Sequence, residues 1–538
     1  MAVPGEDDEA VLESMKARKE AFVTGHGGSD HPWEILWVCS SALWGCWLYA
    51  ELAAAGRGSG GQRTQGFLPE ALVVWFPLVL SQTKHLYPYG SLWMAGEILL
   101  AACLSARRGG TIDRPRTGGD AEKSTTGDRR LFLTLYRSSI YYLTFVAILA
   151  VDFDLFPRRF CKTEVAGYGL MDLGAASFCI SGGIVSGRGW NHDHRNGKGK
   201  GNGRWDSLKP LVRAAPLVAI GIVRTVANKE LDYQEHASEY GVHWNFFFTL
   251  GVLAVVQPLR KRILLGLGGR GGFAAVAVAW APVVAMLAYQ HGLSARGWQS
   301  FVETAPRGPP LGGGGSTVER FFFANREGIL GCIGYVFLHA SGEWIGRCFV
   351  FVDDNRNEDK DERGGSTQKQ KPSMGKLAIA LWVLWWVLSG RGGTEPLGGG
   401  GNHEDDGYYY DYFYEPLPVS RRSTNLAFCV WALAHNVALL WAFGALETWL
   451  RTSGRRENNN APVVVPPTWA AVNRHGMIAF LVANLLTGLV NLTVPTIDTG
   501  DGPALCLLVA YLAGIGAAVH LCDRCLGRPP RRDPLKRD

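Results

Sequence analysis

The sequence lacks several motifs that would assign a chemistry directly. It contains neither a G-x-S-x-G nucleophile elbow nor a Walker phosphate-binding loop, and it has no heptad run. The eleven cysteines are scattered along the chain, which suggests neither a zinc site nor a disulfide framework. The net charge of +6 is spread over many loops, so we expect no nucleic-acid partner. These absences leave the long apolar segments as the main evidence.

A secretory signal peptide and an internal repeat are also missing. Residues 1–30 are polar and charged rather than basic and then apolar, so we expect the first apolar segment to act as a signal anchor. Without a repeat, an inverted-repeat transporter is not specifically indicated. Charged residues make up 19% of the chain against 47% hydrophobic residues, and apolar runs alternate with Gly- and Arg-rich loops. This alternation favours a membrane-embedded bundle over several soluble domains.

About thirteen apolar segments approach the roughly 20 residues that a helix needs to cross the hydrocarbon core. They are residues 33–53, 67–84, 90–106, 131–151, 168–187, 209–227, 241–258, 273–291, 326–346, 375–390, 424–447, 473–493 and 503–522. The segment 375–390 is the least secure by length. The sequence therefore predicts an all-α fold, a polytopic transmembrane helix bundle of about 13 spans.

The basic residues of the loops predict the orientation of this bundle. With the C-terminus in the cytosol, the cytosolic loops hold roughly 35 Lys and Arg against about 14 on the other side, as the positive-inside rule expects. The N-terminus is then non-cytosolic. The predicted organisation is an N-terminal segment, a transmembrane domain, two flexible cytosolic loops and a basic cytosolic tail, at residues 1–32, 33–522, 188–208 with 347–374, and 523–538.

The turn between the fourth and fifth predicted spans is the first candidate site. Pro157 prevents one continuous helix, so the chain can fold back and bring Asp152 near Lys162 at the membrane boundary. A partly desolvated Asp152 could act as a general base toward an alcohol, and Lys162 could stabilise a developing oxyanion. A structural ion pair is the alternative. The other charged residues of this stretch, which could hold substrate or, for the arginines, sit at lipid headgroup level, are Arg158, Arg159, Glu164 and Asp172. Asp172 could equally be a buried partner for one of these cations.

A second constellation opens the seventh predicted span. On a helix, His236, Glu239, Tyr240 and His243 share one face at spacings of three and four residues. The spacing of His236 and Glu239 resembles metal-ligand pairs, but no second such pair occurs, so no metal is expected. A polar helix end that serves a non-cytosolic cavity is the preferred interpretation, with anchoring in the aromatic belt as the alternative for two residues. Those two are Tyr240 and Trp244, and Asn245 completes the candidate set.

Two further polar groups lie at or in later spans. Asn325, Arg326 and Glu327 stand at the mouth of the ninth predicted span, where they could hold a phosphate or sugar hydroxyls, although a snorkelling pair explains them equally well. Asn484 and Asn491 belong to a polar strip in the twelfth span. Such strips more often join helices than bind substrate.

Taken together, these motifs resemble a known family. The stretches EHASEYGVHWNFFFTL, AVDFDLFPRRFCKTE followed by GLMDLGAASF, NREGI and NRHGMIAFLVANLLTGLVNL are similar to the GPI inositol acyltransferase family, which includes PIG-W and the fungal GPI-anchored wall transfer protein. KARKEAFVTGHGGS near the N-terminus resembles that family's opening, so the similarity runs nearly end to end. The departures lie in the Gly-rich loops.

The resemblance implies a multi-pass enzyme of the endoplasmic reticulum membrane, with its motifs toward the lumen. Its reaction would transfer a fatty acyl group, typically palmitoyl, from acyl-CoA to the inositol 2-hydroxyl of glucosaminyl-phosphatidylinositol. Asp152 would be the base and Lys162 its partner, with His236 or His243 as the rival base. No cofactor beyond the co-substrate acyl-CoA and no obligate protein partner is expected. A lipid flippase or transporter, or a non-catalytic scaffold, is the alternative.

Overall fold

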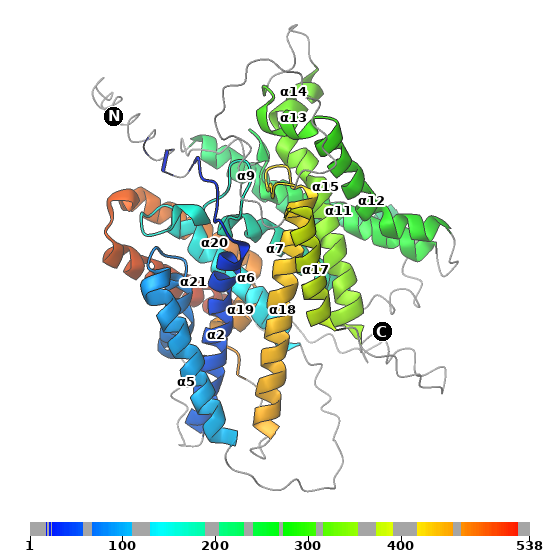
Figure 1. The fold of residues 1–538 in the computed structure, drawn as a ribbon. Coiled ribbons are helices and arrows are strands. Elements are labelled where there is room, and N and C mark those ends of the chain that lie inside the picture. Colours follow the sequence, from blue (N-terminus) through cyan, green and yellow to red (C-terminus); the bar gives the residue numbers. More distant parts are fainter. Residues whose placement is uncertain are drawn as a thin grey trace, which may run out of the picture. The chain divides into compact units, whose positions relative to one another are not determined.

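The computed structural model describes most of the chain. The described residues are 18, 21–22, 24–57, 67–109, 130–188, 204–230, 240–267, 273–307, 316–352, 373–390, 417–455 and 464–525. Within these ranges the secondary structure is helical, and the one β element is an isolated bridge between Ser29 and Tyr168. The predicted all-α fold is therefore confirmed, and each of the thirteen predicted segments contains a helix (Figure 1).

The predicted number of spans is not confirmed. Six described helices are long and apolar enough to cross a membrane. They are α2 (Pro32–Arg57), α6 (Leu131–Ala150), α12 (Phe273–Ala295), α18 (Leu426–Arg455), α20 (Gly476–Thr493) and α21 (Asp501–Cys525). A seventh candidate is a pair bent by 68° at Asn325, made of α14 (Thr317–Ala324) and α15 (Arg326–Ile345), which continues into the π-helix η6 (Gly346–Val350).

The other predicted spans form helices that are too short or too polar to qualify by length and composition. The short apolar helices are α3 to α4 (Phe67–Leu80), α7 (Leu170–Ser186) and α17 (Met374–Leu388). Charged residues or prolines interrupt α5 (Ser91–Gly109), α9 (Arg204–Glu230) and α11 (Phe246–Gly266). The structure therefore supports six or seven candidate spans.

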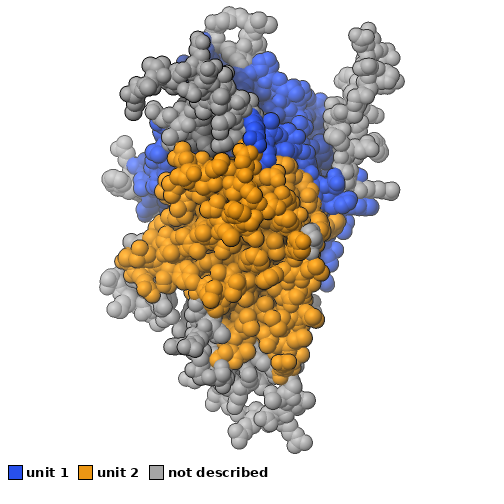
Figure 2. All heavy atoms as spheres, turned by 90° about the vertical axis from the view of Figure 1, so that its left-hand side faces the viewer, with its two compact units in different colours: residues 1–31, 162–437 blue, residues 32–161, 438–538 orange. Residues whose placement is uncertain are grey.

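The chain divides into two compact units, each built from two separate stretches of sequence. Unit 1 contains residues 1–31 and 162–437, and unit 2 contains residues 32–161 and 438–538 (Figure 2). The chain therefore passes from one unit to the other three times. The third passage lies inside a single helix, because α18 contributes Leu426–Val437 to unit 1 and its remainder to unit 2.

Unit 1 is centred on the close packing of α7 against α15. A Cβ atom on Gly183 would lie 2.1 Å from the carbonyl oxygen of His339, and one on Gly342 would lie 2.3 Å from that of Ile180. Only glycine fits at these two positions, because any side chain would force the helix backbones apart. Helix α11 packs against both α9 and α15, and α12 and α13 (Trp298–Thr304) also contact α15.

Unit 2 has an aromatic core. The rings of Trp75, Tyr142 and Trp469 stack in sequence, with centroid separations of 6.4 and 5.3 Å. Tyr142 donates a hydrogen bond of 2.6 Å to the Thr468 hydroxyl, which in turn donates to the buried Glu70 carboxylate. Helices α3, α6 and α19 (Pro467–Arg474) are joined by this network, so side chains from both halves of unit 2 share one core.

Candidate functional site

The turn after α6 presents Asp152 in unit 2. Helix α6 ends at Ala150, and residues 151–169 are non-helical apart from a short 3-10 turn at Arg158–Phe160, as the position of Pro157 predicts. Asp152 is half-buried, and its Oδ2 accepts a hydrogen bond of 2.8 Å from the Asn491 amide. The polar strip of α20 therefore reaches the candidate base.

The two arginines of this turn have partners within unit 2. Arg158 donates to the carbonyl oxygens of Val151, Phe153 and Phe156 at 2.7 to 3.0 Å. Its burial lowers the pKa of Arg158 below the usual value. Arg159 forms an ion pair with Glu34 at the start of α2. Both guanidiniums therefore hold the shape of the turn.

Lys84 fastens the same turn, although sequence analysis did not single it out. Its ammonium lies 2.9 Å from carboxylate oxygens of both Asp154 and Asp501. Hydrogen bonding to these two acids raises the pKa of Lys84. The backbone N–H of Lys84 also donates to the Leu155 carbonyl at 2.8 Å. Lys84, Arg158 and Arg159 thus stabilise the conformation of the Asp152 turn.

Lys162 begins the second stretch of unit 1, where a strap formed by residues 24–31 packs against it. Lys162 and Glu164 are half-buried. The Glu164 N–H donates to the His26 carbonyl at 3.2 Å, and a Cβ on Gly28 would lie 2.6 Å from the Tyr168 nitrogen. Asp152 and Lys162 belong to different units, so their pairing stays a prediction.

Asp172 is the centre of a buried polar network at the start of α7. Its carboxylate accepts from the Thr163 hydroxyl at 2.9 Å and from the Gly169 N–H at 3.2 Å, and it forms an ion pair of 2.7 Å with Arg421. The Arg421 guanidinium also lies over the Tyr240 ring, 5.8 Å from its centroid. The described cation that pairs with Asp172 is thus Arg421, and this network joins three distant segments of unit 1.

The loop before α11 differs from the expected helix. His236 and Glu239 lie outside the described residues, and residues 241–245 are not helical. Gly241 has a φ of 112°, and a Cβ there would lie 2.5 Å from the Asn325 Cα. Tyr240 and His243 therefore do not share a helix face, because a left-handed glycine breaks the helix between them.

The remaining loop residues anchor α11 to its neighbours. Asn245 caps α11 by accepting from the Phe247 N–H at 3.0 Å, and its amide donates to the Gly221 carbonyl of α9 at 2.9 Å. Trp244 donates to the Thr249 hydroxyl at 3.0 Å. The His243 side chain is exposed, while its backbone N–H donates to Asn325 Oδ1 at 2.7 Å.

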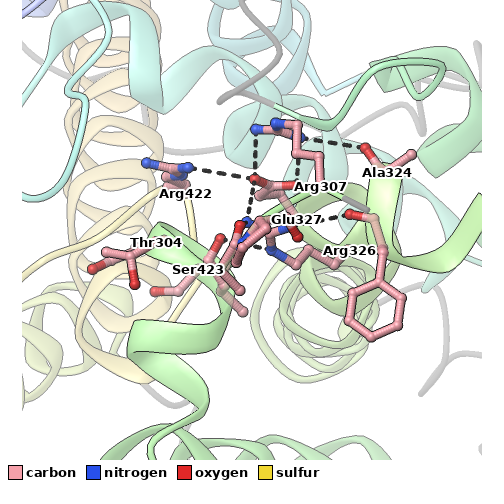
Figure 3. Close-up of polar contacts among 12 residues, drawn as sticks. Thr304, Arg307, Ala324, Arg326, Glu327, Arg422 and Ser423 are labelled. Carbon is pink, nitrogen blue, oxygen red and sulfur yellow. Dashed lines mark hydrogen bonds and ion pairs between the residues drawn. The ribbon is translucent and has the colours of Figure 1, made fainter. Parts of the chain in front are cut away.

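The bend between α14 and α15 carries a dense charge cluster among the described residues of unit 1. We call Arg307, Arg326, Glu327 and Arg422 the Glu327 cluster. The fully buried carboxylate of Glu327 lies 2.9 Å from Arg307, 3.4 Å from Arg422 and 3.9 Å from Arg326 (Figure 3). Three guanidiniums thus surround one acid at the first turn of α15, where the helix dipole also favours negative charge.

The arginines of the Glu327 cluster differ in role. Arg326 is buried and donates to the carbonyl oxygens of Val302, Ala305 and Phe323, so it fixes the chain around the bend. Arg307 and Arg422 remain 29% and 13% exposed and approach the acid from two other segments (Figure 3). These two side chains can reach an anion at the surface of the cluster.

Sequence analysis missed Arg307, Arg421 and Arg422. The signal was present, because Arg421 and Arg422 are adjacent and directly precede a span on the side assigned few basic residues. The neighbouring Ser420 hydroxyl donates to Glu303 at 3.3 Å. Burial raises the pKa of Glu303, while the charge of Arg422 opposes that rise.

A metal site has no support within the described ranges, where no group of three or more His, Cys, Asp or Glu side chains could hold an ion. Cys522 and Cys525 form a C-x-x-C pair in the last turn of α21, and both are free thiols. Asp523 between them is engaged by Arg474 at 2.6 Å and His475 at 3.1 Å.

Comparison with known proteins finds similarity along nearly the whole chain. The GWT1 family model matches residues 15–522. GPI-anchored wall transfer protein 1 of Aspergillus oryzae is 32% identical over 545 residues, which cover 95% of this chain and 98% of that protein. The protein of the same name from Emericella nidulans is 32% identical over 522 residues, covering 94% and 97%. That from Yarrowia lipolytica is 33% identical over 403 residues, covering 74% and 73%.

Proposed function

The chain belongs to the GWT1 family, and on that premise we propose that it is an O-acyltransferase of GPI-anchor biosynthesis. It transfers a fatty acyl group, palmitoyl, from acyl-CoA to the inositol 2-hydroxyl of glucosaminyl-phosphatidylinositol. It acts in the endoplasmic reticulum membrane, with a lumenal N-terminus and a cytosolic C-terminus. It needs no cofactor beyond the co-substrate and no obligate protein partner.

The Glu327 cluster is the observation that supports this proposal most directly. The glycolipid acceptor carries a phosphodiester at the membrane surface, and an arginine pair is well suited to bind phosphate oxygens. Arg307 and Arg422 are held by the buried Glu327 at the bend of a helix pair that is a candidate membrane span. In our proposal they hold the phosphate, while Arg326 and Asn325 position the bend and the loop that carries Tyr240, Trp244 and Asn245.

The proposed chemistry is direct acyl transfer. The inositol 2-hydroxyl oxygen attacks the thioester carbonyl carbon while its proton passes to the Asp152 carboxylate. Lys162 neutralises the oxyanion of the tetrahedral intermediate. The carbon–sulfur bond then breaks, and the CoA thiolate leaves and takes up a proton, which regenerates Asp152. The hydrogen bond from Asn491 supports this role because it orients the Asp152 carboxylate.

The activity assay below also tests two alternatives, a different general base and a different class of membrane protein. His243, whose side chain is exposed, is the rival base within the described residues. A lipid flippase or transporter would share the membrane helices and the buried charges. The close spacing of charges at two helix ends suits either class, whereas family membership favours a role in GPI-anchor biosynthesis.

Acyl transfer by the purified protein tests the proposal. Wild-type protein in detergent should transfer labelled palmitate from palmitoyl-CoA to glucosaminyl-phosphatidylinositol. Asp152→Asn should lower kcat by about 100-fold or more, because the general base is lost. Asp154→Asn is the matched control, since Asp154 is an exposed carboxylate two residues away that pairs with Lys84. It should retain activity within about threefold.

Three results would contradict parts of the proposal. Full turnover by Asp152→Asn would remove Asp152 as the base, and loss of activity in His243→Ala would then assign that role to His243. Absence of transfer by wild-type protein that binds both substrates would remove the acyltransferase function. Transbilayer movement of the glycolipid without acylation would assign the chain to the flippase class.

A further inference from the structure

A second charge cluster lies at the opposite end of α15 from Glu327. Glu343 is buried, and its Oε2 forms an ion pair with the Arg260 guanidinium of α11. Gln257 supports this arginine by accepting from its Nε at 3.1 Å, and it donates to the Val336 carbonyl at 3.2 Å. Lys261 and Arg347 lie near enough for their charges to act on Glu343 as well, so this acid has one paired cation and two more near it. We call these four charged residues the Glu343 cluster.

The ends of three helices meet at this cluster. A Cβ on Gly187, the residue after α7, would lie 2.7 Å from the Glu343 carbonyl oxygen and 2.9 Å from the Arg347 nitrogen. Arg188 follows, and its guanidinium lies over the Phe351 ring at 5.9 Å. Arg347 belongs to η6, and such π-helical turns are frequent at functional sites. The Glu343 cluster is therefore built from the C-terminal parts of α11 and α15 and from η6, and the end of α7 packs directly against it.

These helix ends carry a marked excess of positive charge. Segments 183–188, 257–267 and 339–352 contain Arg188, Arg260, Lys261, Arg262 and Arg347 with Glu343 as their acid, and Asp353 and Asp354 follow the last segment directly in the sequence. Helix dipoles and the positive-inside rule account for single cations at such ends. These two effects do not explain why three of the cations lie near one buried carboxylate. A site for a polyanion accounts for both features.

We propose that the Glu343 cluster binds the phosphate groups of the acyl-CoA donor. The inference rests on the proposed function, because that reaction requires a CoA thioester. CoA carries a pyrophosphate and a 3′-phosphate, and each phosphate offers several oxygens for Arg and Lys. All five cations lie in loops or helix ends that the basic-residue count assigns to the cytosol, which is where the CoA pool lies. The cluster therefore suits capture of the donor from that side.

The length of α15 separates the donor phosphates from the acceptor phosphate. Residues 327 and 343 are sixteen positions apart, or about 24 Å along a helix at 1.5 Å per residue. That distance is close to the roughly 30 Å thickness of the hydrocarbon core. The pantetheine arm can then extend the thioester along the helix toward the acceptor, while the phosphates remain at the other boundary.

Donor kinetics of the full-length protein test this site. Lys261→Gln and Arg347→Gln should each raise KM for palmitoyl-CoA about tenfold, since each removes a charge-assisted contact to phosphate, while kcat stays within about twofold. With S-palmitoyl pantetheine, which keeps the thioester and lacks the nucleotide and its phosphates, wild-type and variant KM values should coincide. Arg347→Lys should restore part of the effect. Arg296→Gln, at an exposed arginine after α12, is the control and should change neither constant.

Several results would overturn the assignment. Equal rises in KM for both donors would show a structural role, and unchanged KM values would show no role. An effect of the variants that appears only with phosphatidylserine present would assign the cluster to lipid headgroups.

A binding measurement separates this proposal from the proposed function. A labelled, non-hydrolysable palmitoyl-CoA thioether should bind wild-type protein and bind Arg347→Gln about tenfold more weakly. Binding without any acyl transfer would contradict the enzyme and support the site, whereas transfer with unchanged thioether binding in the variant would contradict the site alone.

Discussion

Each end of α15 carries a buried glutamate with three cations near it, and the two clusters are closed to different degrees. At the N-terminal end Glu327 is fully buried, and its neighbour Arg326 donates to several backbone carbonyl oxygens. At the C-terminal end Glu343 is also buried, but Lys261 and Arg347 are only half-buried. The first cluster fixes a bend through the buried Arg326 and leaves Arg307 and Arg422 partly exposed, whereas all three cations of the second are partly exposed. In our proposals both clusters bind phosphate, and the first also fixes the chain.

The largest expected effect distinguishes the two acids by stability. Glu327→Gln should lower the free energy of unfolding by about 3 kcal/mol, because three neighbouring guanidiniums lose their buried counter-charge. Glu343→Gln should cost less, since the surrounding cations can be hydrated. Thermal unfolding of both variants in one detergent measures the difference. Equal losses would mean that the two ends are equally closed.

The packing between the ends can be tested with a matched glycine pair. Gly342→Ala should lower the free energy of unfolding by about 2 kcal/mol, because its Cβ would overlap the Ile180 carbonyl oxygen. Gly182→Ala on α7 is the control, since its Cβ would meet the His339 ring at an ordinary 3.8 Å. Unfolding midpoints check both. A tolerated Gly342→Ala would show that α7 and α15 can move apart.

The substrate assignments predict opposite kinetic changes at the two ends. Arg422→Gln should raise KM for glucosaminyl-phosphatidylinositol about tenfold and leave KM for palmitoyl-CoA unchanged. Arg347→Gln should show the reverse. Initial rates at crossed substrate concentrations measure both constants. If both variants affected the same substrate, the division of substrates between the ends would be wrong.

The smallest effect concerns pH and the Glu327 end. Because burial raises the pKa of Glu303, the folded protein holds this proton above pH 4.5, where the unfolded chain releases it. The contribution of Glu303 to stability should therefore fall as pH rises from 4.5 toward the folded pKa. Glu303→Gln should flatten that slope in unfolding measured between pH 4.5 and 6.5. An unchanged slope would show that Glu303 does not titrate differently on folding.

Features of the site could be predicted from the sequence where a residue's partners are its neighbours in the chain, and not where its partners are distant. The break at Pro157 and the polar mouth of α15 follow from neighbouring residues, and both were predicted. The partner of Asp172 is Arg421, far along the chain, and nothing near Asp172 indicates it. The Arg158 side chain is held by hydrogen bonds to backbone carbonyl oxygens, and a sequence pattern does not show where those oxygens lie. The buried acids could thus be singled out from the sequence, whereas most of their cations could not.

The span count shows a related limit. Charged helix ends such as Arg260 to Arg262 belong to α11 itself, and so they reduce its apolar length. The helix break at Gly241 depends on a close approach to Asn325, which sequence periodicity does not encode. Helices were therefore located well, while their crossing of the membrane and their exact starts were not.

The interleaving of the two units has a consequence for synthesis. Residues 32–161 of unit 2 are made first, but Thr468 and Trp469, which complete the core around Tyr142, follow only after residues 162–437. At ~5–20 residues per second the ribosome needs roughly 14–55 s for residues 162–437. Until residue 468 has been made, the core around Glu70 is incomplete and its carboxylate lacks the hydrogen bond from the Thr468 hydroxyl. Protection of these early helices during translation is thus part of what this fold requires.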